Sequence, residues 1–192
     1  FMNVIISEAD RMTRIVQDLL TLSKIDYGKM EMNISRFSFA KAISNVYEAA
    51  KLNAEQNHHH KISFHCEDDI PDVMGDRERI EQVVMNIVSN AIKYTPEHSR
   101  IELFAAPEGK FVRICVTDDG PGIPEESRDK LFDMFYTLGK TRSDGRRGLG
   151  LGLALCRSIV AAHGGVIDVQ NAAPHGACFR FTLPRTEVTL YE

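Results

Sequence analysis

Apolar residues recur at two different periods along this chain, and the order of the two periods limits the folds open to it. Helical spacing, with apolar residues every three or four positions, is found at residues 39–54, 80–92 and 149–163. Strand-like alternation is found at residues 61–67, 100–106, 111–117, 166–169 and 177–183. Strands that can pair as hairpins, with helices between them, predict an α+β fold, a two-layer sandwich in which helices cover one face of a mixed sheet.

A separate helix opens the chain. Its apolar or small residues alternate steps of three and four, the heptad pattern of a bundle seam, at Met2, Ile5, Ala9, Met12, Val16, Leu19 and Ser23. Further apolar residues widen this stripe, so the helix is expected to need the partners of a four-helix bundle. It should end near Gly28, where glycine supplies a left-handed cap. We therefore expect two units, a bundle helix at 1–28 and a globular domain at 29–192.

Local signals set the remaining boundaries. Ser38 and Asp76 are placed to cap the helices that follow them. The segment 107–109 contains proline and glycine and is expected to join two strands into a hairpin. A short helix is expected near 125–132. The polar, glycine-bearing segment 137–147 is expected to be a mobile loop.

Composition and charge exclude several classes of protein. With 43% hydrophobic and 26% charged residues, the 192-residue chain has the composition of a folded soluble domain. Its formal net charge of -4 offers no cationic field that would collect nucleic acid. No stretch approaches the roughly 20 apolar residues of a membrane span. The four cysteines are widely spaced, which is typical of buried thiols in a reducing compartment, so we expect a cytoplasmic location.

Four polar side chains share one face of the helix that Asp76 caps. Asn86, Asn90, Lys93 and Tyr94 fall at i, i+4, i+7 and i+8. For any one of them, a solvated face is the simpler interpretation. Together they suit a magnesium-triphosphate, because amide oxygens are hard ligands for Mg²⁺ and an ammonium group is a point-charge partner for phosphate.

Two glycine-rich segments follow. Residues 118–123 lie where a strand ends, and although such a turn is commonplace, its glycines let the backbone approach a flat ring and Asp118 can accept from an exocyclic amine. Residues 148–153 open a helix, so their N–H groups and the helix dipole suit a phosphate. Neither a Rossmann fingerprint nor a P-loop is present, since Leu153 and Met134 stand where those patterns need glycine.

Together these segments resemble the nucleotide-binding boxes of the GHKL ATPase superfamily, and within it those of the histidine kinases. The N box, first glycine box, F box and second glycine box are matched by residues 82–96, 118–123, 131–136 and 148–153. The resemblance reaches nearly every position of 86–165 and implies the Bergerat ATP-binding fold. Residues 12–28 are similar to the second helix of the family's dimerisation and phosphotransfer domain.

The resemblance implies a role for each matching residue. Asn90 would bind Mg²⁺, Asn86 and Lys93 would face the phosphates as catalytic residues, and Asp118 would bind the adenine amine. The other expected ATP-binding residues are Tyr94, Gly120, Gly122, Ile123, Phe132, Lys140, Arg142, Arg147, Gly148, Leu149, Gly150, Leu151, Gly152 and Leu153. The segment 137–147 would be the ATP lid, and the resemblance leaves open which of its cations meets the γ-phosphate.

The resemblance also implies that the phosphoacceptor lies outside this chain, because none of its seven histidines has the surroundings of the family's acceptor. We expect the ATP-binding catalytic domain of a bacterial two-component sensor histidine kinase, with ATP and Mg²⁺ as cofactors. It would transfer the γ-phosphoryl group to its own dimerisation domain, for relay to a response-regulator aspartate. The full-length protein would be a membrane-anchored homodimer, and the isolated chain would not autophosphorylate. The run 146–153 also weakly resembles potassium-responsive sensor kinases.

Three other functions are compatible with parts of this sequence. A hydrolase of the gyrase or mismatch-repair type would carry a glutamate base where Asn86 stands, and an amide cannot take up a proton. A nucleotide-dependent binding module is disfavoured by the complete boxes and the N-terminal helix. The segment 58–60 with His65 and Cys66 has zinc-binding side chains, but three adjacent histidines cannot aim at one point, so we expect a solvated loop.

Overall fold

The computed structural model describes residues 2–29, 31–138 and 149–185. Twelve helices and strands are assigned within these residues. In chain order they are α1 (Met2–Asp26), β1 (Ser35–Phe37), α2 (Phe39–His58), β2 (Lys61–Cys66), β3 (Val73–Gly75), α3 (Arg77–Tyr94), β4 (Arg100–Glu108), β5 (Phe111–Asp118), α4 (Glu125–Arg128), α5 (Gly152–Ala162), β6 (Ile167–Asn171) and β7 (Ala177–Pro184).

Five of the strands form one mixed sheet in the order β2-β4-β5-β7-β6. β2 and β4 run parallel, and the other neighbouring strands are antiparallel. β4 and β5 form the expected hairpin, but its turn is shorter than predicted, because Glu108 already pairs with Phe111. Gly109 makes this tight connection with a φ of 58°. The short strands β1 and β3 form a separate two-stranded sheet.

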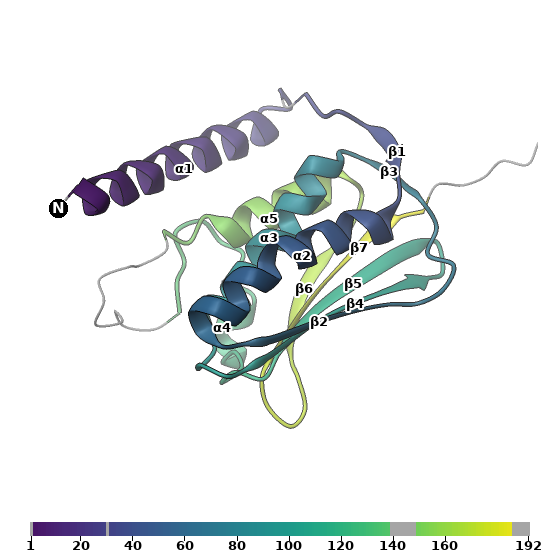
Figure 1. Ribbon diagram of the computed structural model, residues 1–192. Coiled ribbons are helices and arrows are strands. Elements are labelled where there is room, and N and C mark those ends of the chain that lie inside the picture. The colour runs from purple at the N-terminus through teal and green to yellow at the C-terminus, as the bar shows by residue number, and fades with distance from the viewer. Residues whose placement is uncertain (1, 30, 139–148, 186–192) are drawn as a thin grey trace, which may run out of the picture.

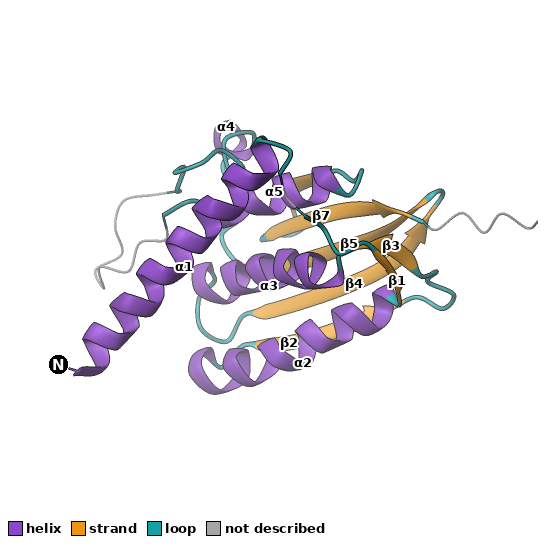
Figure 2. Cartoon of the chain, turned by 90° about the horizontal axis from the view of Figure 1, so that it is seen from above, coloured by secondary structure: helices purple, strands orange, loops and turns teal. Residues whose placement is uncertain are grey.

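Helices α2, α3 and α5 cover one face of the five-stranded sheet (Figures 1 and 2). Along β5 the residues facing the helices are buried, and the residues between them are partly exposed on the opposite face. The seven apolar residues expected to face the core from the third helix are all buried: Ile80, Val83, Val84, Ile87, Val88, Ala91 and Ile92. The predicted α+β sandwich with a mixed sheet is therefore confirmed.

α1 lies alongside α5 (Figure 2). Its Leu22 is buried, and Ile15 and Ile25 pack against the core of the domain. The large apolar residues of the heptad stripe stay exposed on α1: Met2, Ile5, Met12, Val16 and Leu19. The helix thus uses one side to contact the globular domain and leaves the predicted seam uncovered by the described residues.

Several element boundaries differ from the prediction. β3 was not expected, because three residues are too few for an alternation to be recognised. α4 ends at Arg128, short of the predicted 132, and α5 begins at Gly152, later than the predicted 149. Gly150 explains the late start of α5, because its φ of 70° lies outside the right-handed helical region.

Two expectations about side chains were wrong. His60, expected in a solvated loop, is 1% exposed, and its Nε2 lies 3.0 Å from the carbonyl oxygen of Ile92. The four cysteines are free thiols, but only Cys156 is buried, whereas Cys66 is exposed and Cys115 and Cys178 are partly exposed. Among the described helices, none is long and apolar enough to cross a membrane.

Candidate functional site

A cavity of about 990 Å³ opens beside α3, near the upper end of the size of small-molecule sites. Segments far apart in the sequence line it. Twelve of the predicted site residues are brought together there: Asn86, Asn90, Lys93, Tyr94, Asp118, Gly122, Ile123, Leu149, Gly150, Leu151, Gly152 and Leu153. Gly120 and Phe132 do not line it. The predicted residues Lys140, Arg142, Arg147 and Gly148 lie outside the described residues, as does most of the expected mobile lid.

The first turn of α3 is held by a network of hydrogen bonds. Asp76 caps the helix, since its Oδ1 accepts the N–H of Arg79 at 3.2 Å and its Oδ2 accepts the N–H of Asn33 at 3.1 Å. The N–H of Asp76 donates to Nε2 of His163 at 2.9 Å. Nδ1 of His163 therefore carries the proton and donates to the carbonyl oxygen of Ile159 at 2.7 Å. This histidine ties the start of α3 to the end of α5.

The polar face of α3 turns toward the cavity. Asn86, Asn90 and Lys93 are partly buried there, and Nζ of Lys93 lies 4.9 Å from the ring centroid of Tyr94. Asn86 also hydrogen-bonds to the thiol of Cys156 on α5. Burial of this thiol raises its pKa to about 12, and the Asn86 hydrogen bond opposes that shift only in part. Cys156 is therefore a neutral thiol at physiological pH, and it helps to place the Asn86 amide.

Asp118 at the end of β5 forms the buried end of the site. Its Oδ1 accepts the N–H of Gly120 at 2.9 Å and the N–H of Ala177 at 3.3 Å. Burial raises the pKa of this carboxyl group, and the two backbone hydrogen bonds oppose that shift. Among the described residues, both of these bonds go to one oxygen, so Oδ2 stays available to a ligand. A carboxylate held in this way is a fixed acceptor at the cavity wall.

The loop after β5 needs glycine at specific positions. A Cβ on Gly120 would lie 2.8 Å from Cγ2 of Thr95, so this position needs glycine although it does not line the cavity. Gly122 has a φ of 75°. The next residue, Ile123, is clamped by Asn171 of β6, whose Oδ1 accepts its N–H at 2.8 Å and whose Nδ2 donates to its carbonyl oxygen at 3.2 Å.

Phe132 supports the site from behind. It is buried and packs edge-on against Phe179, with 6.5 Å between ring centroids, and Phe179 itself lines the cavity. The segment after it is joined to the second glycine segment, because the N–H of Phe135 donates to the carbonyl oxygen of Gly150 at 3.0 Å. Tyr136 lines the cavity and donates its hydroxyl to Oγ of Ser127 at 3.0 Å.

α1 contributes an unexpected wall to the cavity. Its residues Glu8, Arg11, Arg14, Ile15 and Asp18 line it. Burial raises the pKa of Asp18, and the charge of Arg14 opposes the shift. Nothing in the sequence indicated this wall, since polar residues between heptad positions are typical of a solvated face.

Comparison with known proteins identifies the family. Residues 75–187 match a family described as histidine kinase-, DNA gyrase B- and HSP90-like ATPases. The catalytic domain of the histidine kinase ThkA has a TM-score of 0.70 and 34% identity, over 81% of this chain and 97% of that one. The chain belongs to the histidine kinases of this ATPase family. This kinase domain therefore has the predicted Bergerat fold and ATP-binding function.

Longer relatives show the same likeness. The sensor protein KdpD of Clostridium acetobutylicum is 36% identical over 95% of this chain and 20% of its own length. Full-length ShkA, solved in complex with AMPPNP, has a TM-score of 0.79 and 28% identity, over 93% of this chain and 36% of that one. ThkA has also been solved with the response regulator TrrA, with 31% identity and a TM-score of 0.75, over 96% of this chain and 50% of that one.

The chain spans between 20% and 46% of the length of the curated relatives it matches. Within this kinase domain, some residues that shape the site lie outside the four nucleotide-binding boxes and were not predicted from the sequence. Asn171 and Ala177 are examples, and only their long-range pairing reveals them. Gly176 carried a signal, because a glycine before a strand indicates a turn. Its φ of 109° places its backbone against that of Asp118.

Proposed function

We propose that this domain binds Mg²⁺-ATP and transfers the γ-phosphoryl group to a histidine located outside the chain. The observation that carries the proposal is the position of Asp118, a buried carboxylate fixed by two backbone N–H groups at the wall of the cavity. An exocyclic adenine amine would donate to its Oδ2, whereas guanine presents a carbonyl oxygen at that position and would be repelled.

The adenine ring would lie against the loop after β5. Ile123 and Gly122 line the cavity beside Asp118, and Asn171 holds Ile123 in place through two hydrogen bonds. Tyr94 borders the same cavity and is 49% exposed. These apolar and backbone surfaces would bury the ring, and Asp118 would set its orientation.

The triphosphate would extend toward α3 and α5. Asn90 fits a magnesium ion, because it lines the cavity and an amide oxygen is a ligand that Mg²⁺ accepts. Asn86, on the same helical face, would face the phosphates. The ion would neutralise charge on the phosphate oxygens. Lys93 would supply a cation, and the N–H groups at the start of α5 would face the phosphates.

The arrangement favours transfer over hydrolysis. Phosphoryl transfer depends mainly on positioning and charge neutralisation. Asn86 stands where a hydrolysing relative would carry its base, and its amide, which hydrogen-bonds to Cys156, cannot accept a proton from water. The site would therefore hold ATP with slow turnover until an acceptor imidazole is presented.

The exposed stripe of α1 supports a proposal for the organisation of the whole protein. We propose that residues 1–28 are the last helix of a dimerisation and phosphotransfer domain and that 29–192 form the catalytic domain. The exposed heptad stripe of α1 would pack in a homodimeric four-helix bundle. Its partners would be that bundle's phosphoacceptor and a response-regulator receiver domain, as supported by the ThkA–TrrA complex. The domain would then work in the cytoplasm beneath a membrane-anchored sensor.

The test supplies the missing acceptor. The chain alone, given radioactive ATP and Mg²⁺, should bind nucleotide without labelling itself. Addition of a separate dimerisation hairpin that carries the parent's histidine should give weak labelling of the hairpin, because covalent linkage no longer raises its effective concentration. A hairpin with that histidine replaced by glutamine is the control. Rapid ATP turnover by the chain alone, or stable labelling of its own histidines, would contradict the proposal.

A further inference from the structure

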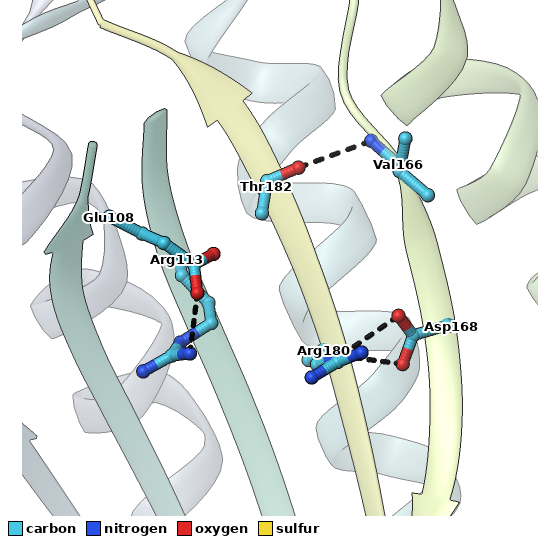
Figure 3. Close-up of polar contacts among 6 residues, drawn as sticks. All are labelled: Glu108, Arg113, Val166, Asp168, Arg180 and Thr182. Atoms are coloured by element: carbon cyan, nitrogen blue, oxygen red, sulfur yellow. Dashed lines mark hydrogen bonds and ion pairs between the residues drawn. The ribbon is translucent and has the colours of Figure 1, made fainter. Parts of the chain in front are cut away.

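The sheet face that the helices leave open carries two cysteines on neighbouring strands. Arg180 of β7 lies directly opposite Cys115 of β5, and Cys178 lies directly opposite Thr117. Figure 3 shows Arg113 and Arg180 in front of the strands, with the helices behind. Because directly opposed residues share a face and residues two apart share a face, Cys115 and Cys178 lie on this open side with Arg180.

The two thiols form a diagonal cross-strand pair. Both are partly exposed, and the two side chains hydrogen-bond to each other. Their neighbours on the face are cationic but are held by carboxylates. Nε of Arg180 lies 2.7 Å from Oδ1 of Asp168, and Nη1 of Arg113 lies 2.7 Å from Oε1 of Glu108 (Figure 3). Both arginines are thus held by ion pairs with carboxylates on the same face as the two cysteines.

The pKa values of the two thiols are shifted in opposite directions. The thiol of Cys115 donates to Cys178, which lowers the pKa of Cys178 to about 6, with further help from a Thr117 hydrogen bond and the Arg180 charge. The same interaction raises the pKa of Cys115, so its proton is retained. Of the four cysteines, all within the described residues, only Cys178 is shifted toward the thiolate. Thiolates are the nucleophiles in cysteine oxidation.

We propose that Cys178 and Cys115 form an oxidant-sensitive dithiol, in which Cys178 reacts with a hydroperoxide and Cys115 resolves the product into a disulfide. In the first step the Cys178 sulfur attacks the peroxide, the O–O bond breaks, and Cys178 becomes a sulfenic acid while the peroxide is reduced to water or an alcohol. In the second step the Cys115 sulfur attacks that sulfenic sulfur. The S–S bond forms, the S–O bond breaks, and one water leaves with the Cys115 proton.

The cross-link would reach the nucleotide site through the backbone. Diagonal cross-strand positions are about 7–8 Å apart, whereas disulfides join Cα atoms up to about 6.8 Å apart. Closing the bond therefore draws β5 and β7 together. Cys178 follows Ala177, whose N–H donates to Asp118, and Thr117 precedes Asp118 in β5. The strand shift thus acts on the fixed carboxylate, and this consequence rests on the proposed function.

The first experiment measures thiol chemistry alone. The 192-residue chain is alkylated with iodoacetamide between pH 5 and 9 and mapped by peptide mass spectrometry. Cys178 should react first, with a rate midpoint near pH 6, consistent with a pKa of about 6. Cys66 should react only at more alkaline pH, because partial desolvation and the charges of Asp68 and Glu67 raise its pKa. Faster labelling of Cys66 at neutral pH would overturn the assignment of Cys178 as the nucleophile.

The second experiment follows oxidation. Hydrogen peroxide at neutral pH should lower the mass of the chain by about 2 Da and yield a cross-linked peptide pair, both reversed by dithiothreitol. Cys178→Ser should abolish the mass loss. Cys115→Ser should stop at a sulfenic acid that dimedone traps, and Cys66→Ser is the matched control that should behave as the unchanged chain. A stable sulfinic acid on Cys178 without a cross-link in the unchanged chain would contradict the role of Cys115.

The third experiment tests the link to nucleotide. The oxidised chain should bind ATP at least about fivefold more weakly than the reduced chain in calorimetry, and peroxide-treated Cys115→Ser should bind as the reduced chain does. Equal affinity of the cross-linked and reduced chains would overturn the link. Failure of the reduced chain to bind ATP would instead count against the proposed function, and the alkylation and cross-linking results would still stand.

Discussion

The two ends of the cavity are built in different ways. At the proposed adenine end, Asp118 and Ile123 are held by hydrogen bonds from β6, β7 and the loop after β5, so their positions depend on the sheet and its loops. At the proposed phosphate end, Asn86, Asn90 and Lys93 project from one face of α3 as partly buried side chains. The first end is fixed by hydrogen bonds to the backbone before a ligand arrives. At the second end, Lys93 has a long side chain that can adjust around a ligand, whereas Asn86 is held through Cys156.

This difference suits two separate tasks. A fixed acceptor discriminates between bases, because a misplaced donor finds no compensating partner. An ammonium group on a long side chain can follow a phosphate through its transfer, where charge neutralisation counts more than shape. Changes at the phosphate end should therefore affect the reaction most, and changes at the adenine end should affect affinity and base selectivity.

The largest effect is expected for Asn90→Ala. Loss of groups that only support a metal ligand costs about 10–100-fold, so loss of the ligand itself should reduce phosphoryl transfer to the added hairpin by more than about 100-fold. Transfer is measured as radioactive labelling of the hairpin. Asn53→Ala on α2 is the control and should leave labelling unchanged. Transfer by Asn90→Ala within tenfold of the unchanged chain would remove Asn90 from the metal site.

The second effect is expected for Asp118→Asn. An amide can turn a donor toward the adenine amine, so ATP affinity should fall by about 1.5–3 kcal/mol, or roughly 10–150-fold. Calorimetry with ATP and GTP should show that preference for ATP is also reduced. Asp119→Asn is the control, since Asp119 interacts with Arg100 instead. Unchanged affinity in Asp118→Asn would exclude this carboxylate from adenine recognition.

The pH dependence of the domain provides an intermediate test. Because burial raises the pKa of Asp118 above 3.8, its acceptor is lost on acidification at a higher pH than for an ordinary aspartate, and ATP affinity should fall there. The free energy of unfolding without nucleotide should change in the opposite direction and rise on acidification. The burial penalty exists while the group is ionised and is relieved as pH falls through the raised pKa toward 3.8. Asp118→Asn should flatten the pH dependence of ATP binding, which calorimetry measures.

The smallest effect is expected for Asn171→Ala, which removes two hydrogen bonds to Ile123 without touching the proposed ligand contacts. Each neutral hydrogen bond contributes about 1 kcal/mol, and the side chain is exposed, so ATP affinity should fall roughly fivefold. Gln170→Ala, one residue earlier on β6, is the control. If Asn171→Ala weakened binding as strongly as Asp118→Asn, the adenine end would depend on loop position more than on the carboxylate.

Local patterns predicted most of the fold. Ser38 and Asp76 cap their helices through side-chain acceptors, as expected from residue type alone, and the apolar spacing of α3 identified its whole buried face. These features depend on neighbours within one or two turns. The alternation at 111–117 and 177–183 likewise predicted the strands β5 and β7.

The features that were missed depend on distant pairing. Asn171 clamps a residue 48 positions earlier, and His163 receives the N–H of Asp76, 87 positions earlier. His60 appears polar in the sequence and is buried against α3. In each case the partner could not be identified from spacing, because the contact forms only after helices and strands have packed.

The position of β7 between β5 and β6 has a consequence for synthesis. The chain leaves the ribosome from its N-terminus, so β5 emerges before β7. Until β7 is synthesised, the edge of β5 that faces away from β4 has no partner strand. The Ala177 N–H that holds Asp118 belongs to β7, so the adenine end cannot form on a nascent chain that stops short of this strand. A nascent chain should therefore begin to bind nucleotide only after β7 has paired with β5.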